Sequence, residues 1–177
     1  LSISLTAIWG LVYMRMKCTG VLSVAVISVF FVGCTTDEQE AIDLVNDPFV
    51  DRQSEIRAAV LSIKSDVEAS NPVGLQALHL NSAKFTKFGP RGFERQDVTS
   101  TNESEAAFFG SITNAEYEIQ DLKIDVFGDI GIATYYPQVR FMRDGHEVQV
   151  SGRQTLVFLK TGSDWKLVHE HGTARSP

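Results

Sequence analysis

A series of strand-like segments joined by tight turns in the second half of the chain most constrains how it can fold. Apolar residues alternate after Asn114, and turn signals follow at Gly128-Asp129, Asp144-Gly145 and Gly162-Ser163. Turns of this kind between alternating segments are typical of β-hairpins. The pattern therefore predicts four consecutive antiparallel strands, with no helix between residues 130 and 160.

Two irregularities within these segments predict distorted strands. Tyr117 and Ile119 alternate in one phase, whereas the apolar residues from Leu122 onward alternate in the other. A change of phase inside one strand predicts a bulge, here near Gln120-Asp121. Pro137 lacks a backbone N–H, which predicts an edge strand or a bulge in the following segment.

The first half of the domain has helical spacing. A first helix that ends near Asn71 is predicted by Ile56, Val60, Ile63 and Val67. Asn71 and Pro72 predict the start of a short second helix that continues into Phe85. Ser100 and Glu103 form a capping-box pattern, which predicts a third helix that buries Phe108, Phe109 and Ile112. Three helices before a curled antiparallel sheet predict an α+β domain, in which the helices on one sheet face leave a cone-shaped cavity.

The N-terminal part has the pattern of a secretory signal peptide. Basic residues at Arg15 and Lys17 precede an apolar run from 21 to 32 that is short for a membrane span. Its end, Phe31-Val32-Gly33-Cys34, resembles a bacterial lipobox, in which the cysteine is lipidated and becomes the first residue. An uncleaved N-terminal anchor helix is the alternative interpretation.

This pattern predicts how the chain is divided. Residues 1–33 are the expected signal peptide, of which 1–13 precede a plausible start at Met14 or Met16. Residues 34–49 form an acidic tether behind lipidated Cys34, and residues 50–177 form the domain. We expect a protein of the cell envelope, anchored in the membrane by lipid and facing the periplasm or the exterior.

Charge and cysteine content exclude several other classes. The net charge is −6, and all 22 acidic residues follow Cys34. An acidic chain without a basic cluster is a poor partner for nucleic acid. Cys18 lies in the part that would be removed, so the processed chain would contain no disulfide, and its stability must come from its core.

Several segments carry a family resemblance: Phe85–Pro90, Val126–Thr134, Gly152–Thr155 and Trp165–His171. In this order they resemble the SnoaL-like branch of the nuclear transport factor 2-like superfamily over about residues 50–174. The Trp165–His171 ending is also similar to the association domain of calcium/calmodulin-dependent kinases. The resemblance implies a cone-shaped fold. It leaves activity open, because the superfamily includes isomerases, dehydratases, cyclases, epoxide hydrolases, binding proteins and oligomerisation modules.

The last strand contains the first candidate site residues, His169 and His171. Strand alternation places them on one face with Trp165 and Leu167, about 7 Å apart. They are interpreted as acid–base or ligand-binding groups of a pocket wall, or alternatively as core histidines with backbone partners. A metal would need a third ligand from His79, His146 or a carboxylate, so no metal is predicted.

Further candidates lie on the neighbouring strands. Arg153 would clamp a carboxylate if its guanidinium points inward, and it would be an ordinary surface residue otherwise. Tyr135 and Tyr136 are adjacent, so one of the two should face the cavity and donate a hydrogen bond. Asp66 and His79 are weaker candidates that we expect to be exposed.

Three functions are consistent with these patterns. The favoured one is an envelope lipoprotein whose domain binds a small, partly apolar molecule, such as an organic anion, without a cofactor and as a homodimer. The second is an enzyme of the isomerase, dehydratase or cyclase kind that uses His169 or His171 as its base and Arg153 or a tyrosine to stabilise an oxyanion. It lacks an identifiable carboxylate for the general base that ketosteroid isomerases use. The third is an oligomerisation module with a vestigial pocket.

Overall fold

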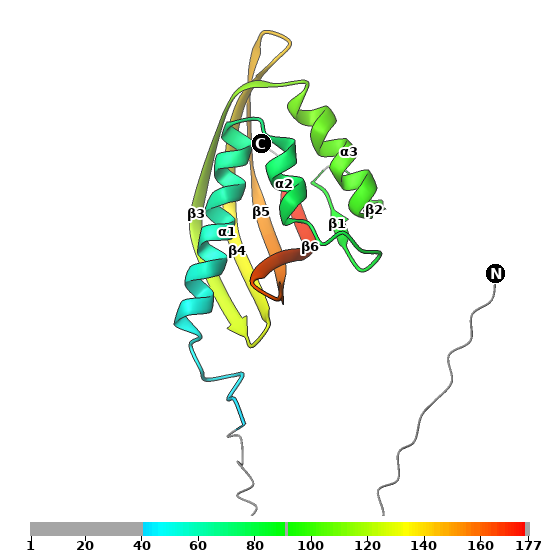
Figure 1. The fold of residues 1–177 in the computed structure, drawn as a ribbon. Helices are drawn as coiled ribbons and strands as arrows, with labels where there is room; N and C mark the ends of the chain where they lie inside the picture. The colour runs from blue at the N-terminus through cyan, green and yellow to red at the C-terminus, as the bar shows by residue number, and fades with distance from the viewer. Residues whose placement is uncertain (1–40, 91, 176–177) are drawn as a thin grey trace, which may run out of the picture. The chain divides into compact units, whose positions relative to one another are not determined.

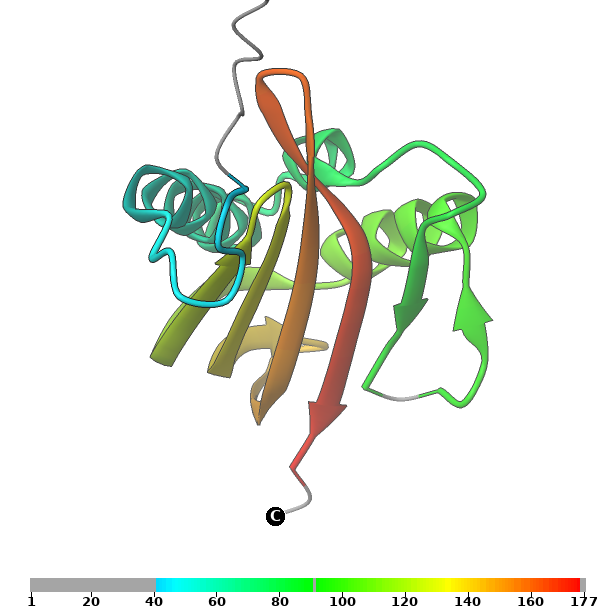
Figure 2. The same cartoon turned by 90° about the horizontal axis from the view of Figure 1, so that it is seen from below.

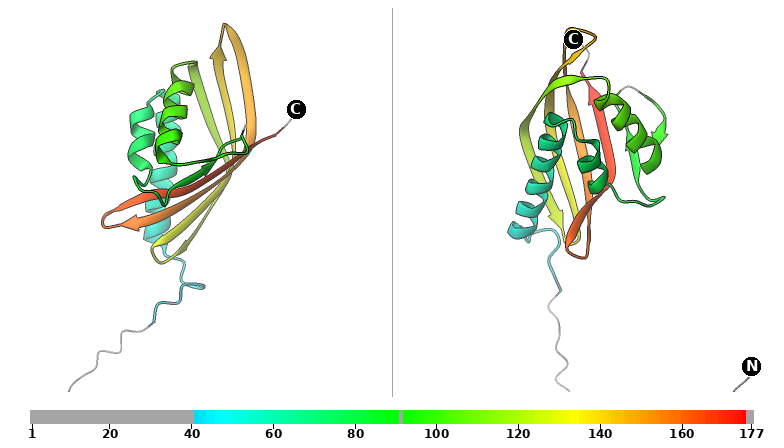
Figure 3. Two further views of the ribbon diagram at one scale, coloured as in Figure 1. Left: turned by 90° about the vertical axis from the view of Figure 1, so that its right-hand side faces the viewer. Right: turned by 45° about the horizontal axis from the view of Figure 1, so that its top comes forward.

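A computed structural model describes residues 41–90 and 92–175, so the predicted signal peptide and Cys34 lie outside the described residues. The elements are α1 (Val50–Glu68), α2 (Pro72–Leu78), β1 (Thr86–Phe88), β2 (Arg95–Gln96), α3 (Val98–Phe109), β3 (Thr113–Phe127), β4 (Ile130–Arg143), β5 (His146–Thr161) and β6 (Asp164–Ala174). The strands form one sheet in the order β2-β1-β6-β5-β4-β3. The three helices lie on one face of this curved sheet (Figures 1 and 3). The predicted α+β architecture is confirmed.

The predicted hairpins are confirmed. Strands β3 to β6 pair antiparallel in sequence order. Gly128, Gly145 and Gly162 have φ angles of 63°, 78° and 64°, a region that glycine enters without steric cost. No element between residues 130 and 160 is helical.

The two predicted strand irregularities have different outcomes. The β3–β4 register shifts between Gln120 and Lys123, and Asp121 has a φ of 52°, which confirms the predicted bulge. The prediction of an edge strand or a bulge at Pro137 is wrong, because β4 is an interior strand and its register with β5 does not shift there. The sheet accommodates this proline in a gap, because the β4–β5 pairs skip from Tyr135 to Gln138.

The helices begin as expected, with two corrections. Asn71 caps α2 by accepting a hydrogen bond from the Gly74 amide. However, α2 ends at Leu78 and does not continue into Phe85. The capping box of α3 is formed one turn earlier than predicted, by Asp97 and Ser100. Phe109 and Ile112 are buried as predicted, although Ile112 lies beyond the end of α3.

The segment after α2 is a strand, β1, which the sequence analysis did not predict. It pairs in parallel with β6 and places Lys87 opposite Glu170. Together with β2 it extends the sheet beyond β6 (Figure 2). The parallel pairing lies outside the four predicted antiparallel strands, and it directs Lys87 to the helix-covered face.

The final strand contains a bulge that reverses its two faces. Phe158 of β5 pairs with Leu167, whereas the neighbouring Val157 pairs with His169, so Val168 is an extra residue. Beyond such a bulge the side chains alternate in the opposite phase. Glu170 therefore shares the inner face with Leu167, and the histidines on either side of it do not.

Among residues 41–90 and 92–175, no helix combines the length and apolar character that crossing a membrane would require.

Candidate functional site

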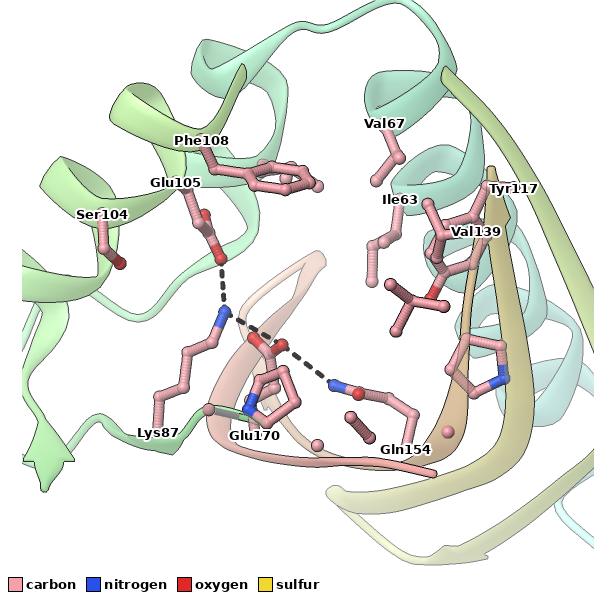
Figure 4. Close-up of a pocket in the computed structure, with 18 of the residues that line it drawn as sticks. Ile63, Val67, Lys87, Ser104, Glu105, Phe108, Tyr117, Val139, Gln154 and Glu170 are labelled. Atoms are coloured by element: carbon pink, nitrogen blue, oxygen red, sulfur yellow. Dashed lines mark hydrogen bonds and ion pairs between the residues drawn. The ribbon is translucent and has the colours of Figure 1, made fainter. Parts of the chain in front are cut away.

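A pocket of about 820 Å³ lies between the helices and the inner face of the sheet. Its apolar wall includes Ile63 and Val67 of α1, Phe108 of α3 and Val139 of β4 (Figure 4). Alternate residues of a strand share one face, and for this reason β4 contributes every second residue from Tyr135 to Arg143. The volume is in the range of pockets that hold small organic molecules.

A polar floor lies at the β1–β6 side of this pocket, defined here as Lys87, Glu105, Glu170, His79 and Gln154. The Lys87 Nζ atom lies 2.6 Å from Glu105 Oε1 and 3.1 Å from Glu170 Oε1. Gln154 Nε2 donates to the same oxygen of Glu170 over 2.9 Å. Figure 4 shows the ammonium group between the two carboxylates. Three elements far apart in the sequence, β1, α3 and β6, thus meet at one point.

Burial and ion pairing shift the pKa values of Lys87 and Glu170 in opposite directions. The side chains of Lys87, Glu105 and Glu170 are only 12%, 14% and 16% exposed. Burial lowers the pKa of Lys87, but the two carboxylates raise it by more. Burial raises the pKa of Glu170, and the charge and hydrogen bond of Lys87, with contributions from His79 and Gln154, bring it below its ordinary value. Both residues of this pair are therefore charged at neutral pH.

Glu105 and His79 leave hydrogen-bonding capacity open on the floor. Glu105 Oε2 is buried and has no hydrogen-bond partner among the described residues. His79 Nδ1 lies 2.8 Å from Asn102 Oδ1, and an amide oxygen can only accept, so Nδ1 carries the proton. Its Nε2 atom lies 3.9 Å from Glu105 Oε2, beyond hydrogen-bonding distance. A ligand group that donates a hydrogen bond would satisfy the open Glu105 oxygen.

A pair of tyrosines supplies a donor from the sheet side. The hydroxyl oxygens of Tyr117 and Tyr135 lie 3.1 Å apart, and both residues line the pocket. Burial is the main cause that raises the pKa of Tyr117 to about 12 and that of Tyr135 well above its ordinary value. Both are therefore neutral, and because one hydroxyl donates to the other, one O–H remains for a ligand.

The structure corrects the placement of His169 and His171. The Val168 bulge turns both rings to the outer face of the sheet, and neither lines the pocket. His169 Nδ1 lies 2.8 Å from Thr86 Oγ1, and both rings pack against Phe88 at centroid distances of 6.0 and 5.9 Å. The two histidines thus fasten the outer faces of β1 and β6 together.

The other predicted residues are divided between the pocket and the outside. Tyr135 faces the pocket as one of the tyrosine pair was expected to, whereas Tyr136 is 48% exposed and does not line it. Arg153 borders the pocket but is exposed, and it alternates with Gln154, which points to Glu170. Its exposure fits the surface alternative better than the inward clamp. His79 was expected to be exposed and is buried, while half-buried Asp66 accepts a hydrogen bond from Asn71 away from the pocket.

The polar floor was missed because its residues carry no local signature. Glu170 lies between the candidate residues His169 and His171, and its inward position depends on the bulge. Lys87 depends on β1, and Glu105 reads as a solvent-facing residue of a helix. The alternation of buried Phe85 with Lys87 was the available signal, because it places this lysine on an apolar face.

A metal ion is the other group that these side chains suggest. Ligand atoms of His79, Glu105 and Glu170 lie within 4.8 Å of one another. The Lys87 ammonium, however, already contacts both carboxylates. A metal would have to displace it, so the donor set fits a lysine-bridged carboxylate pair better than a metal centre.

Comparisons with known proteins agree with the fold. The model of the SnoaL-like domain family matches residues 56–174. A candidate dehydratase of the NTF2-like family from Streptomyces avermitilis is 18% identical to this chain, with a TM-score of 0.66. The match covers 72% of this chain and 99% of that chain. An NTF2-like superfamily protein from Salmonella enterica has the same identity and TM-score, with 72% and 94% covered.

A third similar structure is a candidate association domain of calcium/calmodulin-dependent protein kinase II from Xanthomonas campestris. It is 14% identical with a TM-score of 0.60, and 68% of this chain and 86% of that chain are covered. A search of curated proteins finds no match. These TM-scores establish the shared fold, and identities this low leave the activity to be argued from the pocket.

Proposed function

The chain belongs to the SnoaL-like domain family, and from that premise we propose that it binds a small, partly apolar molecule in the pocket between helices and sheet. The observation that carries the proposal is the combination of an open cavity of about 820 Å³ with an apolar wall and a buried polar floor. Such pockets bind organic molecules by apolar contact and orient them by a few polar groups. A molecule with a hydrogen-bond donor at one end would give the buried Glu105 Oε2 atom the partner that it lacks among the described residues.

An oligomerisation module with a vestigial pocket would be expected to have a collapsed cavity. Here the cavity is open, and its floor holds two carboxylates and a lysine away from bulk water. Burying such groups costs free energy. Their presence in an open cavity supports a ligand-binding role over a purely structural one.

Two neighbouring alanines of α3 allow a matched test of binding. Ala107 lines the pocket and Ala106 does not, although both are exposed. Ala107→Trp should narrow the pocket and weaken binding of the neutral fluorescent probe N-phenyl-1-naphthylamine about tenfold, equivalent to about 1.4 kcal/mol. Ala106→Trp should bind like the wild type. Equal binding by both variants, or none by the wild type, would contradict the proposal.

Proton-transfer catalysis is the second candidate, and the polar floor is the observation that favours it. Glu105 Oε2 has no partner and could accept a proton, while the free tyrosine O–H could stabilise an oxyanion. This assigns the acid–base role to the floor in place of His169 and His171. The resemblance to a candidate dehydratase is consistent with such chemistry.

Hydrogen–deuterium exchange at carbon tests this candidate directly. The wild type should accelerate exchange of the α-protons of cyclic ketones in D₂O, followed by NMR, and Glu105→Gln should abolish the acceleration. Glu103→Gln, on the same helix but outside the pocket, is the control. Exchange at the uncatalysed rate by the wild type would leave binding as the function.

We further propose that the domain is held at the cell envelope by lipid on Cys34. The basic residues, apolar run and Gly33-Cys34 sequence support this, and the acidic segment before α1 would act as a solvated tether.

A further inference from the structure

Arg143 ends the inner face of β4. Alternate residues of this strand line the pocket: Tyr135, Pro137, Val139, Phe141 and Arg143. The first four are apolar or aromatic, and the last is a guanidinium. The pocket therefore has a cationic group on β4 in addition to the polar floor on β1 and β6.

The surroundings of Arg143 hold it in place without neutralising it. Its guanidinium carbon lies 5.3 Å from the centre of the Phe108 ring and 5.2 Å from that of Phe141. Nη2 donates to Ser111 Oγ over 3.1 Å, and that hydroxyl in turn donates to the Phe108 carbonyl. No carboxylate pairs with Arg143 within residues 41–90 and 92–175. Aromatic faces and a hydroxyl thus orient the cation and leave its charge available.

The Nε atom of Arg143 gives the second, independent observation. It is buried and has no hydrogen-bond partner in the part of the chain that the structure describes. Burying a donor without an acceptor costs free energy. The edge of a guanidinium formed by Nε–H and one Nη–H matches the two oxygens of a planar carboxylate.

We propose that Arg143 binds the carboxylate of the ligand, so that the pocket selects a small organic acid with an apolar or aromatic body. This inference rests on the proposed function and names its substrate class. The anion belongs at Arg143 because Lys87 already pairs with two carboxylates and Arg153 is exposed at the border of the pocket. The apolar body then contacts the wall beside Phe108 and Val139, which also line the pocket.

A pair of isosteric probes tests the proposal. 2-Naphthoate and 2-naphthamide have the same ring and differ in charge, and each can displace N-phenyl-1-naphthylamine. The wild type should prefer 2-naphthoate, and Arg143→Gln should weaken its binding about tenfold or more, the scale of a charged hydrogen bond. Binding of 2-naphthamide should stay unchanged.

Two further variants keep the test decisive. Arg140→Gln removes an exposed arginine of the same strand that pairs with Glu116 outside this pocket, and it should leave both affinities unchanged. Ser111→Ala retains the Arg143 charge but removes the hydrogen-bond acceptor of Nη2. It should weaken the binding of 2-naphthoate less than Arg143→Gln does. If Arg143→Gln fails to fold in thermal melts, Ser111→Ala decides the question.

The outcomes separate the two proposals. Equal wild-type affinity for both probes, or a preference for 2-naphthoate that survives Arg143→Gln, would overturn the carboxylate site while leaving the pocket function intact. No binding of the neutral fluorescent probe would overturn the proposed function and this inference together.

Discussion

At the scale of single residues, the polar floor balances one ammonium group against two carboxylates in a place with little water. Lys87 contacts Glu105 and Glu170, and the side chains of all three are mostly buried. Removing one partner of a buried ion pair leaves an uncompensated charge, which is why such changes are strongly destabilising. Lys87 is therefore the residue whose loss should affect stability most among the charged groups of the pocket.

Lys87→Met should lower the free energy of unfolding at pH 7 by about 3 kcal/mol, measured by urea denaturation. Lys64→Met is a matched control, because Lys64 pairs with Glu68 on the surface of α1. Its effect should stay below about 1 kcal/mol, as for exposed pairs. Equal losses for the two variants would show that the floor does not depend on the lysine.

The pH dependence of this difference follows from the direction of the two pKa shifts. The pKa of Glu170 is lowered in the folded protein, so its contribution is present above the ordinary glutamate pKa of about 4.3 and is lost as the pH falls through the folded value. The pKa of Lys87 is raised, so its contribution is complete below about 10.4 and is lost at still higher pH. The gap between wild type and Lys87→Met should narrow in acid, and a gap that is constant from pH 3 to pH 7 would contradict this account.

At the scale of elements, the bulge in β6 determines which side chains enter the pocket. Val168 is the additional residue between two consecutive pairs with β5. Deleting it would leave a regular strand in which Leu167 and Glu170 still face inward, because strand residues alternate. The inward direction of Glu170 therefore depends on the bulge only as long as Val168 is present.

The Val168 deletion should consequently fold and retain binding of N-phenyl-1-naphthylamine. Deleting Val157 from β5 is the control, because the facing strand then has one residue fewer and every side chain on one side of the deletion changes face. Circular dichroism and probe titration distinguish the two. Unfolding of the Val168 deletion to the same extent as the Val157 deletion would refute the assigned register.

Local signals explain which elements the sequence could predict. The three hairpin turns and the Asn71 cap are encoded in neighbouring residues, and all are found where expected. The bulge at Asp121 was visible as a change of apolar phase. The β6 bulge lies in a stretch without glycine or proline, where valine, histidine and glutamate give no clear alternation, so its phase change could not be seen. The strand β1 has only three residues and depends on pairing with β6, so the alternation of Phe85 with Lys87 is a weak signal by itself.

The candidate site was less predictable than the fold for the same reason. The sequence could narrow the tyrosine that faces the pocket to Tyr135 or Tyr136. The pocket itself follows from helices packed on a curved sheet. The direction of Glu170, Lys87 and Arg143 depends on register and on strands that meet only in the folded domain. The sequence therefore indicates a pocket but does not indicate which polar groups lie inside it.

At the scale of the whole molecule, the domain encloses one polar floor in a mostly apolar interior, and its residues contain no cysteine, because the cysteines of the chain lie at Cys18 and Cys34. The sheet and the helices on one of its faces together enclose the pocket, and Glu105 of α3 joins Lys87 and Glu170 of the sheet in the polar floor (Figure 4). The proposed role of residues 1–40 is to place the pocket at the envelope.

That role gives the last prediction. In a bacterial host, the chain started at Met14 should be recovered with the membrane, and its processed mass should include lipid on Cys34. Cys34→Ser should release or mislocalise the protein and remove the added mass, because membrane attachment by lipid depends on burying acyl CH₂ groups, each worth about 0.8 kcal/mol. Cys18→Ser changes a thiol that would be removed with the signal peptide and should leave fractionation unchanged. Membrane recovery and mass that are the same for Cys34→Ser as for the wild type would instead support an uncleaved anchor helix.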